Sequence, residues 1–325
     1  MHRNYIVEFD DGFKVFYRGQ NTVALPQQNK DIYFGDPLSL KREVAVMRRL
    51  HQTAIKAPEI YFFEEGKSGT YAILSFLEGV RFNDYLRQQG HQLPVFFNSL
   101  RDIGRTLASA STILFDKFGS VQADGIGDAR INFADRLTDV LGRHATNPSV
   151  RSLFTDAEWT GIETYIAETL AEIRAHSSLR AQLVVYDLHA RNFFVHAEGK
   201  HAGDLCGVFD VEFAQAAPAS LEWHFMSLAL FSLYGKKWFT KAKAAFLQGY
   251  GEGGGDVTDN QVLQQAYAIN YALSVVGFYN GFHDGIRDGW SAAFKQWTLD
   301  IVRGSYDPGL QAELTRPLHK VPVID

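Results

Sequence analysis

Three polar side chains interrupt apolar stretches of the chain at spacings that would let them meet. Asp187 and Asn192 lie five residues apart in VVYDLHARNFFV, and Asp210 follows 18 residues beyond Asn192 in GVFDVEF. Polar groups inside a buried stretch are costly unless they are satisfied or used. A loop of five residues can turn both side chains toward one cleft, and a short hairpin can return Asp210 beside Asn192.

Such a set of side chains suits phosphoryl transfer from a nucleotide. That reaction needs an acid to orient the attacking hydroxyl, oxygen ligands for magnesium and a base to hold the phosphates. Asp187 and Asn192 could supply the first and part of the second, and Asp210 could supply the rest. A carboxylate and an amide oxygen that converge there would form a magnesium site.

Each of these residues also has an ordinary structural interpretation. Asp187 alone is typical of a turn or cap, because Asp and Asn often bond their own backbone. The spacing of the three residues together favours the functional interpretation. We interpret His189 as a structural residue bonded to a nearby carbonyl group. Glu212 fits a place beside the metal and a surface ion pair equally well.

The N-terminal part of the chain predicts a small antiparallel sheet with one inserted helix. An Asp-Gly turn between two β-prone runs indicates a hairpin over residues 4–18. Residues 19–37 have the composition of a long loop. Apolar residues at helical spacing predict a helix that begins near Leu38. Two further strands are expected within residues 59–79.

The rest of the chain is helical in pattern, except that residues 182–213 predict two short strands around a loop. Helices are expected at residues 93–114, 128–143, 156–177, 219–233, 237–249, 258–282 and 290–303. We therefore expect an α+β chain of two lobes, with a small sheet lobe at residues 1–79 and a large helical lobe at residues 80–325.

Composition excludes several other classes of protein. The 325 residues carry a net charge of -5, which argues against a broad electrostatic grip on nucleic acid. No apolar run has the length and purity of a membrane span, and the N-terminus lacks the pattern of a signal peptide. Cys206 is the single cysteine and is expected to be a small buried hydrophobic residue. These features predict a cytoplasmic protein.

VVYDLHARNFFV followed by GVFDVEFAQAAP resembles the catalytic and metal loops of the aminoglycoside phosphotransferase and choline kinase group. These are small-molecule kinases with the protein-kinase-like fold. Their usual pattern is His-Gly-Asp-Leu-His, about four residues ending in Asn, and then Ile-Asp-Trp/Phe-Glu. YAILSFLEG resembles the hinge strand of that family, which ends in a Gly. LKREVAVMRRL resembles the helix whose glutamate pairs with a basic residue on the third strand. Phe118-Gly119-Ser120 also fits the common order, so the resemblance covers roughly residues 4–225.

The resemblance implies a role for each matching residue. Asp187 would be the catalytic aspartate, and Asn192 with Asp210 would bind Mg²⁺. Glu43 would be the helix glutamate that holds a basic strand residue. The backbone at three hinge positions would bind the adenine of ATP, namely Ser75, Phe76 and Leu77. The phosphate acceptor would be a hydroxyl group of a small molecule, held by the helical lobe.

The basic partner of Glu43 has two candidates. Arg18 stands six residues after the turn Gly12, where this family often has Arg or Lys. Lys14 is the rival, and both side chains fall on the same face of the strand. We favour Arg18, because a guanidinium group stays charged and binds phosphate oxygens in a fork.

The chain departs from the family pattern at three places. Val185-Tyr186 replaces the usual His-Gly, and Glu222 stands where an Asp is common. In that family a first strand and a Gly-rich phosphate loop should precede Asn4, and only three residues stand there. We therefore expect either that the first strand is absent or that the nucleotide is held with fewer N-terminal contacts. An alternative therefore stays open, a nucleotide-binding regulator or pseudokinase that does not transfer phosphate.

Other questions stay open at this point. A protein kinase is disfavoured, because no activation segment separates Asp210 from Pro218. The identity of the acceptor and the oligomeric state do not follow from the sequence. Asp284 and Asp288 could face a cationic acceptor, although a solvated helix end is the simpler interpretation of these two acids.

Overall fold

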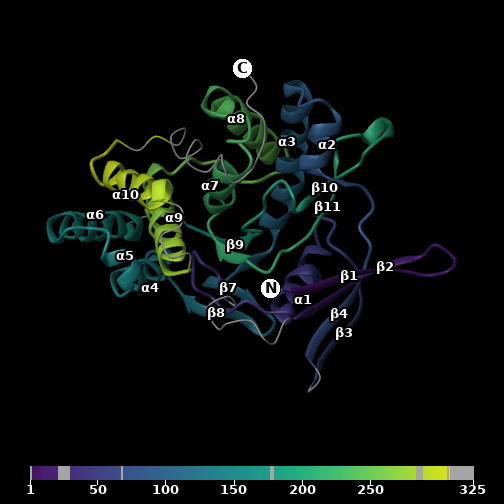
Figure 1. The fold of residues 1–325 in the computed structure, drawn as a ribbon, viewed down its shortest axis with the longest axis horizontal. Coiled ribbons are helices and arrows are strands. Elements are labelled where there is room, and N and C mark those ends of the chain that lie inside the picture. The colour runs from purple at the N-terminus through teal and green to yellow at the C-terminus, as the bar shows by residue number, and fades with distance from the viewer. Residues whose placement is uncertain are drawn as a thin grey trace.

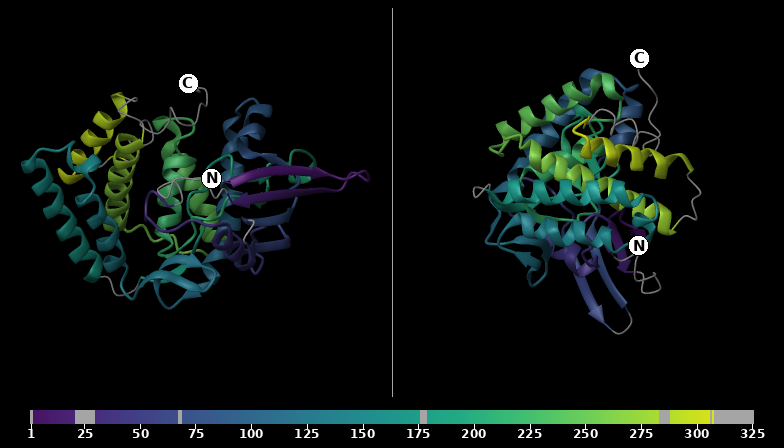
Figure 2. Two further views of the ribbon diagram at one scale, coloured as in Figure 1. Left: turned by 60° about the horizontal axis from the view of Figure 1, so that its bottom comes forward. Right: turned by 90° about the vertical axis from the view of Figure 1, so that its left-hand side faces the viewer.

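The structure is a computed structural model that describes residues 2–20, 30–66, 69–175, 179–282, 288–305 and 307, with backbone alone for His2, 279–282 and 288–290. It has the expected α+β organisation, an N-terminal antiparallel sheet followed by a mostly helical part (Figures 1 and 2). The expectation for Asp284 and Asp288 concerns side chains outside the described residues.

The N-terminal sheet has four strands in the order β1-β2-β4-β3. Their bounds are β1 His2–Glu8, β2 Lys14–Gln20, β3 Ile60–Gly66 and β4 Gly69–Ser75. The expected hairpin is confirmed, because β1 pairs antiparallel with β2, and its turn uses Gly12 at a φ of 83°. A residue without a Cβ is favoured at that backbone angle. The hairpin projects from the rest of the molecule (Figure 2).

Helix α1 (Leu40–Leu50) lies between β2 and β3 in the chain and packs against the sheet. It begins two residues later than expected, because the hydroxyl of Ser39 accepts a hydrogen bond from Arg42 N at 3.1 Å and caps the first turn. Val44 and Met47 are buried against the sheet side, as the apolar spacing of the segment predicts. The cap and the apolar face together fix where Glu43 lies.

Two small sheets occupy the centre of the molecule. One has the order β11-β10-β5, and the other has the order β6-β9-β12-β7-β8. Their strands are β5 Val80–Arg81, β6 Leu114–Phe115, β7 Phe118–Gln122, β8 Gly125–Arg130, β9 Ala181–Val184, β10 Phe193–Val195, β11 Leu205–Val208 and β12 Gln215–Ala217. Residues 182–213 were predicted to form two short strands around a loop, and they contain three strands, because the loop that carries Asp187 divides the first apolar run into β9 and β10.

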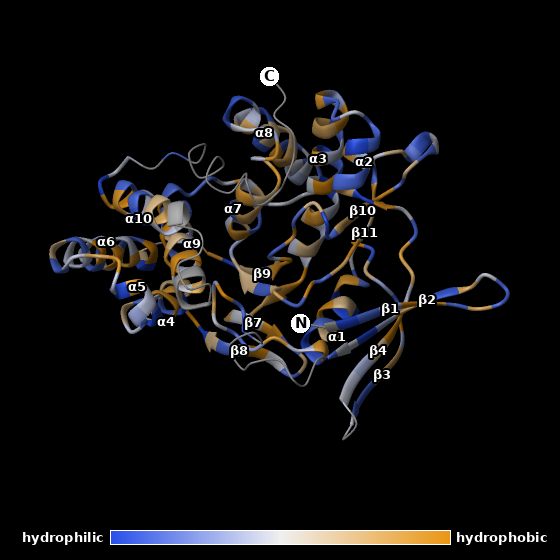
Figure 3. Ribbon diagram, in the orientation of Figure 1, coloured by the Kyte–Doolittle hydropathy of each residue, from blue (hydrophilic) through white to orange (hydrophobic). Residues whose placement is uncertain are grey.

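Nine helices follow α1 in the described residues. They are α2 Phe82–Gln88, α3 Leu93–Ala108, α4 Phe133–Ala145, α5 Pro148–Arg151, α6 Asp156–Ala175, α7 Ser220–Ala229, α8 Lys236–Glu252, α9 Gln261–Phe282 and α10 Asp288–Val302. Much of α9 and β9 is hydrophobic (Figure 3), in keeping with the buried Ala272, Leu273 and Val276. Among the described residues, no helix is both long and apolar enough to cross a membrane.

The helix expected at residues 128–143 is wrong at its start. Residues 118–130 form the β7–β8 hairpin instead, with Gly125 at the turn. Helix α4 begins at Phe133, because the side chain of Asn132 caps it by accepting from Ala134 N at 2.8 Å. The segment 93–114 is also divided, since α3 ends at Ala108 and a short 3₁₀ turn and β6 follow.

Residues 30–37, which we call the 30–37 loop, enter the core between β2 and α1. The loop is closed by hydrogen bonds from Asp31 N to Asp36 O and from Gly35 N to Asp31 O, at 2.8 and 2.7 Å. The carboxylate of Asp36 is fully buried and binds Arg136 at 2.6 Å. A charge this deep is tolerable only when it is paired, so the ion pair ties the loop to α4.

Candidate active site

The β10–β11 pair brings Asn192 and Asp210 to the same end of one hairpin. Phe193 pairs with Val208, and Phe209 N donates to Asn192 O at 3.0 Å. Asp210 therefore follows directly on the residue that faces Asn192 across the hairpin. Asp210 has a φ of 62°, in the left-handed region that residues other than glycine seldom adopt. Non-glycine residues held there cost about 1–3 kcal/mol and gather at functional sites.

Asp187 stands in the loop between β9 and β10, also with a left-handed φ of 61°. Its backbone carbonyl accepts from Asn192 Nδ2 at 3.3 Å, which joins the two ends of the loop. The carboxyl group lines a pocket of about 210 Å³. Burial raises the pKa of Asp187 well above its ordinary value, and the neighbouring Asp210 and Asp31 raise it further. A carboxylate that holds a proton more tightly is a better acceptor for the proton of an alcohol.

Arg18 connects the N-terminal sheet to this hairpin. Its Nε lies 2.6 Å from Glu43 Oε2, and its Nη2 lies 2.5 Å from Asp210 Oδ1. The guanidinium group also lies over the ring of Phe209, with Cζ 4.7 Å from the centroid. Glu43 is fully buried, and burial raises its pKa while Arg18 opposes that rise. One side chain therefore aligns β2, α1 and the Asp210 turn.

The structure separates Arg18 from its rival on the strand. Lys14 lies at the other end of β2, where its Nζ is 3.2 Å from Glu8 Oε2 and the side chain is 41% exposed. Arg18 is 3% exposed and is the candidate that meets Glu43 and Asp210. That Arg18, and not Lys14, binds the phosphates stays a prediction.

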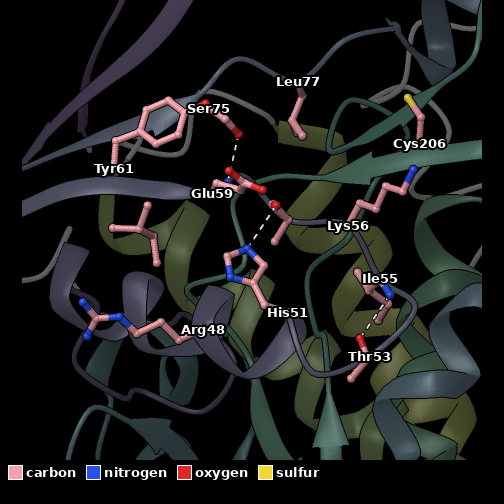
Figure 4. A pocket seen from close by; sticks show the side chains of 12 residues that line it. Arg48, His51, Thr53, Ile55, Lys56, Glu59, Tyr61, Ser75, Leu77 and Cys206 are labelled. Atoms are coloured by element: carbon pink, nitrogen blue, oxygen red, sulfur yellow. Dashed lines mark hydrogen bonds between the residues drawn. The ribbon is translucent and has the colours of Figure 1, made fainter.

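The hinge residues follow β4 and lie beside a different pocket. Ser75 and Leu77 line a hollow of about 850 Å³ with residues from the end of α1 and the loop before β3 (Figure 4). Ser75 is already paired with Glu59, since Ser75 N donates to Glu59 O at 2.8 Å and Ser75 Oγ accepts from Glu59 N at 2.9 Å. Phe76 is 37% exposed. Their contact with adenine stays a prediction.

The donor atoms beside Asp210 fit a hard divalent cation. The amide nitrogen of Asn192 is used in the bond to Asp187, which leaves the amide oxygen as a ligand atom. One oxygen of Asp210 binds Arg18, and the side chain is 40% exposed, so the carboxylate can also meet an ion. Carboxylate and amide oxygens are the ligands that Mg²⁺ prefers, with water and phosphate oxygens completing the set. Within the described residues, no group of three or more His, Cys, Asp or Glu forms a further candidate metal site.

Glu222 is a residue of the site that the sequence did not assign. It is buried on α7, and its Oε2 accepts a hydrogen bond from Val185 N at 2.9 Å, two residues before Asp187. Burial raises the pKa of Glu222 to about 8. Because Val185 and Tyr186 are buried where the family pattern has His-Gly, Glu222 and the apolar packing together hold the loop that carries Asp187.

Two smaller expectations can be placed in the structure. The ring of His189 faces the amide of Arg191, with Nδ1 at 3.3 Å from Arg191 N, rather than the carbonyl group that was expected. The reason is local, because the carbonyl of His189 itself accepts from Asn192 N at 2.8 Å and closes the turn. Cys206 is buried as expected, and its thiol donates to Glu78 O at 3.0 Å.

Comparison with known proteins adds a family and a fold. The profile described as APH, phosphotransferase enzyme family, matches residues 25–265. Similar solved structures include the GDP and kanamycin complex of APH(2")-IIia, at 9% identity, TM-score 0.53 and coverage of 93% of this chain and 89% of that chain. Another is the GDP complex of wild-type aminoglycoside 2'-phosphotransferase-IIIa, at 11% identity, TM-score 0.54 and the same coverage of 93% and 89%. No curated protein sequence matches the chain.

Proposed function

The chain belongs to the phosphotransferase enzyme family, and on that premise we propose that it transfers the γ-phosphoryl group of a nucleoside triphosphate to a hydroxyl group of a small molecule. The convergence of Asp187, Asn192 and Asp210 supports this proposal. The three residues lie on one loop and one hairpin, and two of them hold strained backbone angles. Strain at a site is kept only when the surrounding structure enforces it.

In this proposal each side chain has one task. Asp187 orients the acceptor hydroxyl and takes its proton. The hydroxyl oxygen then bonds to the γ-phosphorus while the bond from that phosphorus to the bridging oxygen breaks, which gives a phosphate ester and a nucleoside diphosphate. Asn192 and Asp210 would hold Mg²⁺, which supplies neutralisation of phosphate charge when bound.

Arg18 completes the proposed constellation. Its guanidinium group is held from behind by Glu43, so it presents fixed N–H donors on the side of the Asp210 turn. Fixed donors lower the barrier because they need not reorganise as charge moves. The proposed division places nucleotide binding in residues 1–79 and the catalytic loop in residues 80–325. The single cysteine is in keeping with a cytoplasmic site of action.

We propose ATP as the phosphate donor. GTP should be tested as a second donor, because the two solved structures of similar fold described above contain GDP. The test is release of nucleoside diphosphate from ATP or GTP with Mg²⁺, measured with and without members of an alcohol library. Release that depends on one alcohol class, and that is lost in Asp187→Asn, is the expected result. Clear nucleotide binding with no transfer to any alcohol would contradict the proposal.

One contact bears on nucleotide binding both in the proposed function and in the alternative, a nucleotide-binding protein without turnover. Phe16 of β2 and Phe209 meet across the space between sheet and hairpin, with ring centroids 4.9 Å apart and planes at 84°. A base that enters between these elements must displace one of the rings. The same transfer assay decides between the two functions, because the alternative predicts binding alone.

A further inference from the structure

The pocket beside Asp187 is small, and rings and aliphatic side chains form somewhat more than half of its surface. Its volume of about 210 Å³ is below the roughly 300–1,000 Å³ of sites that hold drug-sized ligands. Three rings form much of its wall, from Tyr33, Phe225 and Tyr271, and Leu228 and Leu233 extend the apolar surface. A ligand that fills such a space is compact and presents carbon rather than many polar groups.

The ring wall comes from both lobes and is already in place. Tyr33 belongs to the 30–37 loop, whereas Phe225 and Tyr271 belong to α7 and α9. The ring of Tyr33 stacks on Tyr271 at 5.4 Å with 13° between planes, and meets Phe225 edge-on at 5.8 Å. A flat ligand group that contacts these rings would therefore meet faces whose positions are fixed.

The backbone of Tyr33 is also held in place. Tyr33 N donates to Asp31 Oδ1 at 2.7 Å, and Tyr33 O accepts from Asn270 Nδ2 at 3.2 Å. Asp31 is itself buried inside the loop. The side chains of the wall lose their conformational freedom when the chain folds. A small ligand can therefore bind without the further entropic cost of ordering them.

The charges around the pocket disfavour a polycation. Among the described residues that line it, Asp187 is the single acid, and Arg191, His189 and Asn83 are the other polar groups. An ammonium group buried there would pair with Asp187 and block it, and a second ammonium group would find no other acid among the described lining residues. An anionic acceptor would face Asp187 and have only the solvent-exposed Arg191 to offset it.

We propose that the acceptor is a small uncharged alcohol with one flat ring, which lies against Tyr33, Phe225 and Tyr271 and points its hydroxyl group at Asp187. The inference rests on the proposed phosphotransferase function and narrows its acceptor. It assigns Tyr33, a residue of the N-terminal part of the chain, as a determinant of acceptor specificity. The transfer forms a bond from the alcohol oxygen to the γ-phosphorus, releases nucleoside diphosphate and passes the hydroxyl proton to Asp187.

The experiment compares four probes that differ in charge or size. They are benzyl alcohol, its 4-aminomethyl derivative, its 4-carboxy derivative and kanamycin. Binding to the full chain is measured by saturation-transfer NMR with competition, and phosphate transfer is measured separately with ATP and GTP. We expect benzyl alcohol to bind at least about tenfold more tightly than either charged derivative, a difference near 1.4 kcal/mol.

Variants locate the binding. Tyr33→Leu and, on a different element, Phe225→Leu should each weaken binding of benzyl alcohol several-fold. Phe62→Leu should leave it unchanged, because Phe62 is an exposed aromatic on β3 that is 47% accessible. Thermal melts check that each variant folds, and the comparison of probes on the wild-type chain stands without them. Equal or tighter binding of kanamycin or the aminomethyl derivative overturns the inference, as does unchanged binding in both ring variants.

The two proposals fail in different ways. If benzyl alcohol binds as expected but receives no phosphate from either nucleotide, the proposed function fails and the pocket assignment stands. If kanamycin is phosphorylated and benzyl alcohol is not, the proposed function stands and the inference about the acceptor fails.

Discussion

At the scale of single residues, the site is marked by backbone conformation as well as by side-chain type. Among the described residues, four that are not glycine have positive φ, namely His91, Asp128, Asp187 and Asp210. Two of these four are the aspartates that the sequence spacing selected. Asp tolerates the left-handed region better than most residues, because its short polar side chain can bond nearby backbone groups. Aspartate therefore suits both the left-handed backbone angle and the proposed chemistry at these two positions.

Asp187→Asn should remove most of the turnover and spare the fold. Asn also tolerates the left-handed φ of 61°, so the loop keeps its shape while the proton acceptor is lost. We expect kcat to fall by about 10²–10⁴-fold, the range that general-base groups contribute. Steady-state kinetics and nucleotide affinity by calorimetry make the measurement. Near wild-type turnover would show that another group accepts the proton.

Glu222 should make stability depend on pH. Its folded pKa of about 8 lies above the ordinary 4.5, so between these values the folded chain holds a proton that the unfolded chain has released. Stability is then full below the lower value and falls as pH rises toward the upper one, by at most about 1.4 kcal/mol per pH unit. Thermal melts from about pH 5 to pH 8 measure the slope.

The matched variant for this effect is Glu222→Gln. Its amide oxygen can still accept the hydrogen bond from Val185 N, but the side chain does not titrate. The pH slope of the melting temperature should be smaller in the variant than in the wild type. Identical slopes would mean that Glu222 is ionised in the folded chain.

The sequence spacing predicted that Asp187, Asn192 and Asp210 lie close together, and it predicted less about their surroundings. The spacing of Asp187, Asn192 and Asp210 carries local information, because one loop and one hairpin join them. Tyr33 has no such signal, since its contacts with Phe225 and Tyr271 exist only after distant segments fold together. Strand parity could not separate Lys14 from Arg18 for the same reason.

At the scale of elements, helices α3 and α8 approach each other closely through glycine. A Cβ at Gly249 would lie 1.8 Å from Arg101 O, and one at Gly104 would lie 2.3 Å from Phe246 O. Both contacts are with backbone, which cannot turn aside as a side chain can. Small residues let helix axes come closer than the usual 8–10 Å spacing favours. Helix α8 also contacts α7, the helix that carries Glu222.

Gly249→Ala should therefore destabilise the fold although alanine is the better helix former. The added methyl group forces the two helices apart, and overpacking of this kind costs about 1–3 kcal/mol. Gly142 on α4 is the control, because a Cβ there meets nothing within 4 Å. Gly142→Ala should stabilise the chain by about 0.5–1 kcal/mol. Chemical denaturation measures both, and equal effects at the two positions would contradict the argument.

The elements themselves show where local pattern is sufficient. The β1–β2 hairpin and α1 follow from an Asp-Gly turn and an apolar face, and both are confirmed. The β7–β8 hairpin carries an Asp-Gly pair as well, at Asp124-Gly125, but the helix expected from residue 128 overlapped the end of β8. The cap at Asn132 sets the start of α4, and Asn is a residue type that favours this position.

At the scale of the whole molecule, a few contacts join the N-terminal part of the chain to the β10–β11 hairpin. Arg18 binds Asp210, Phe16 packs on Phe209, and Val208 N donates to Lys56 O at 2.8 Å. The first contact would align the catalytic groups, whereas the second fills space between the lobes. In the proposed function, a nucleotide must keep the contact between Arg18 and Asp210 and displace one of the two rings, which would couple its binding to the interface between the two parts of the fold.

Phe16→Ala should thus change nucleotide affinity without touching Asp187, Asn192 or Asp210. If the ring fills the space that the base enters, its removal spares the cost of displacing it, and ATP should bind several-fold more tightly. Phe9→Ala is the control, since Phe9 lies on the same hairpin, is 50% exposed and packs on Phe13. Calorimetric titration with ATP and Mg²⁺ compares the three chains. Weaker binding in Phe16→Ala alone would show instead that the ring is a wall on which the base stacks, and that the contact with Phe209 forms only when the cleft is empty.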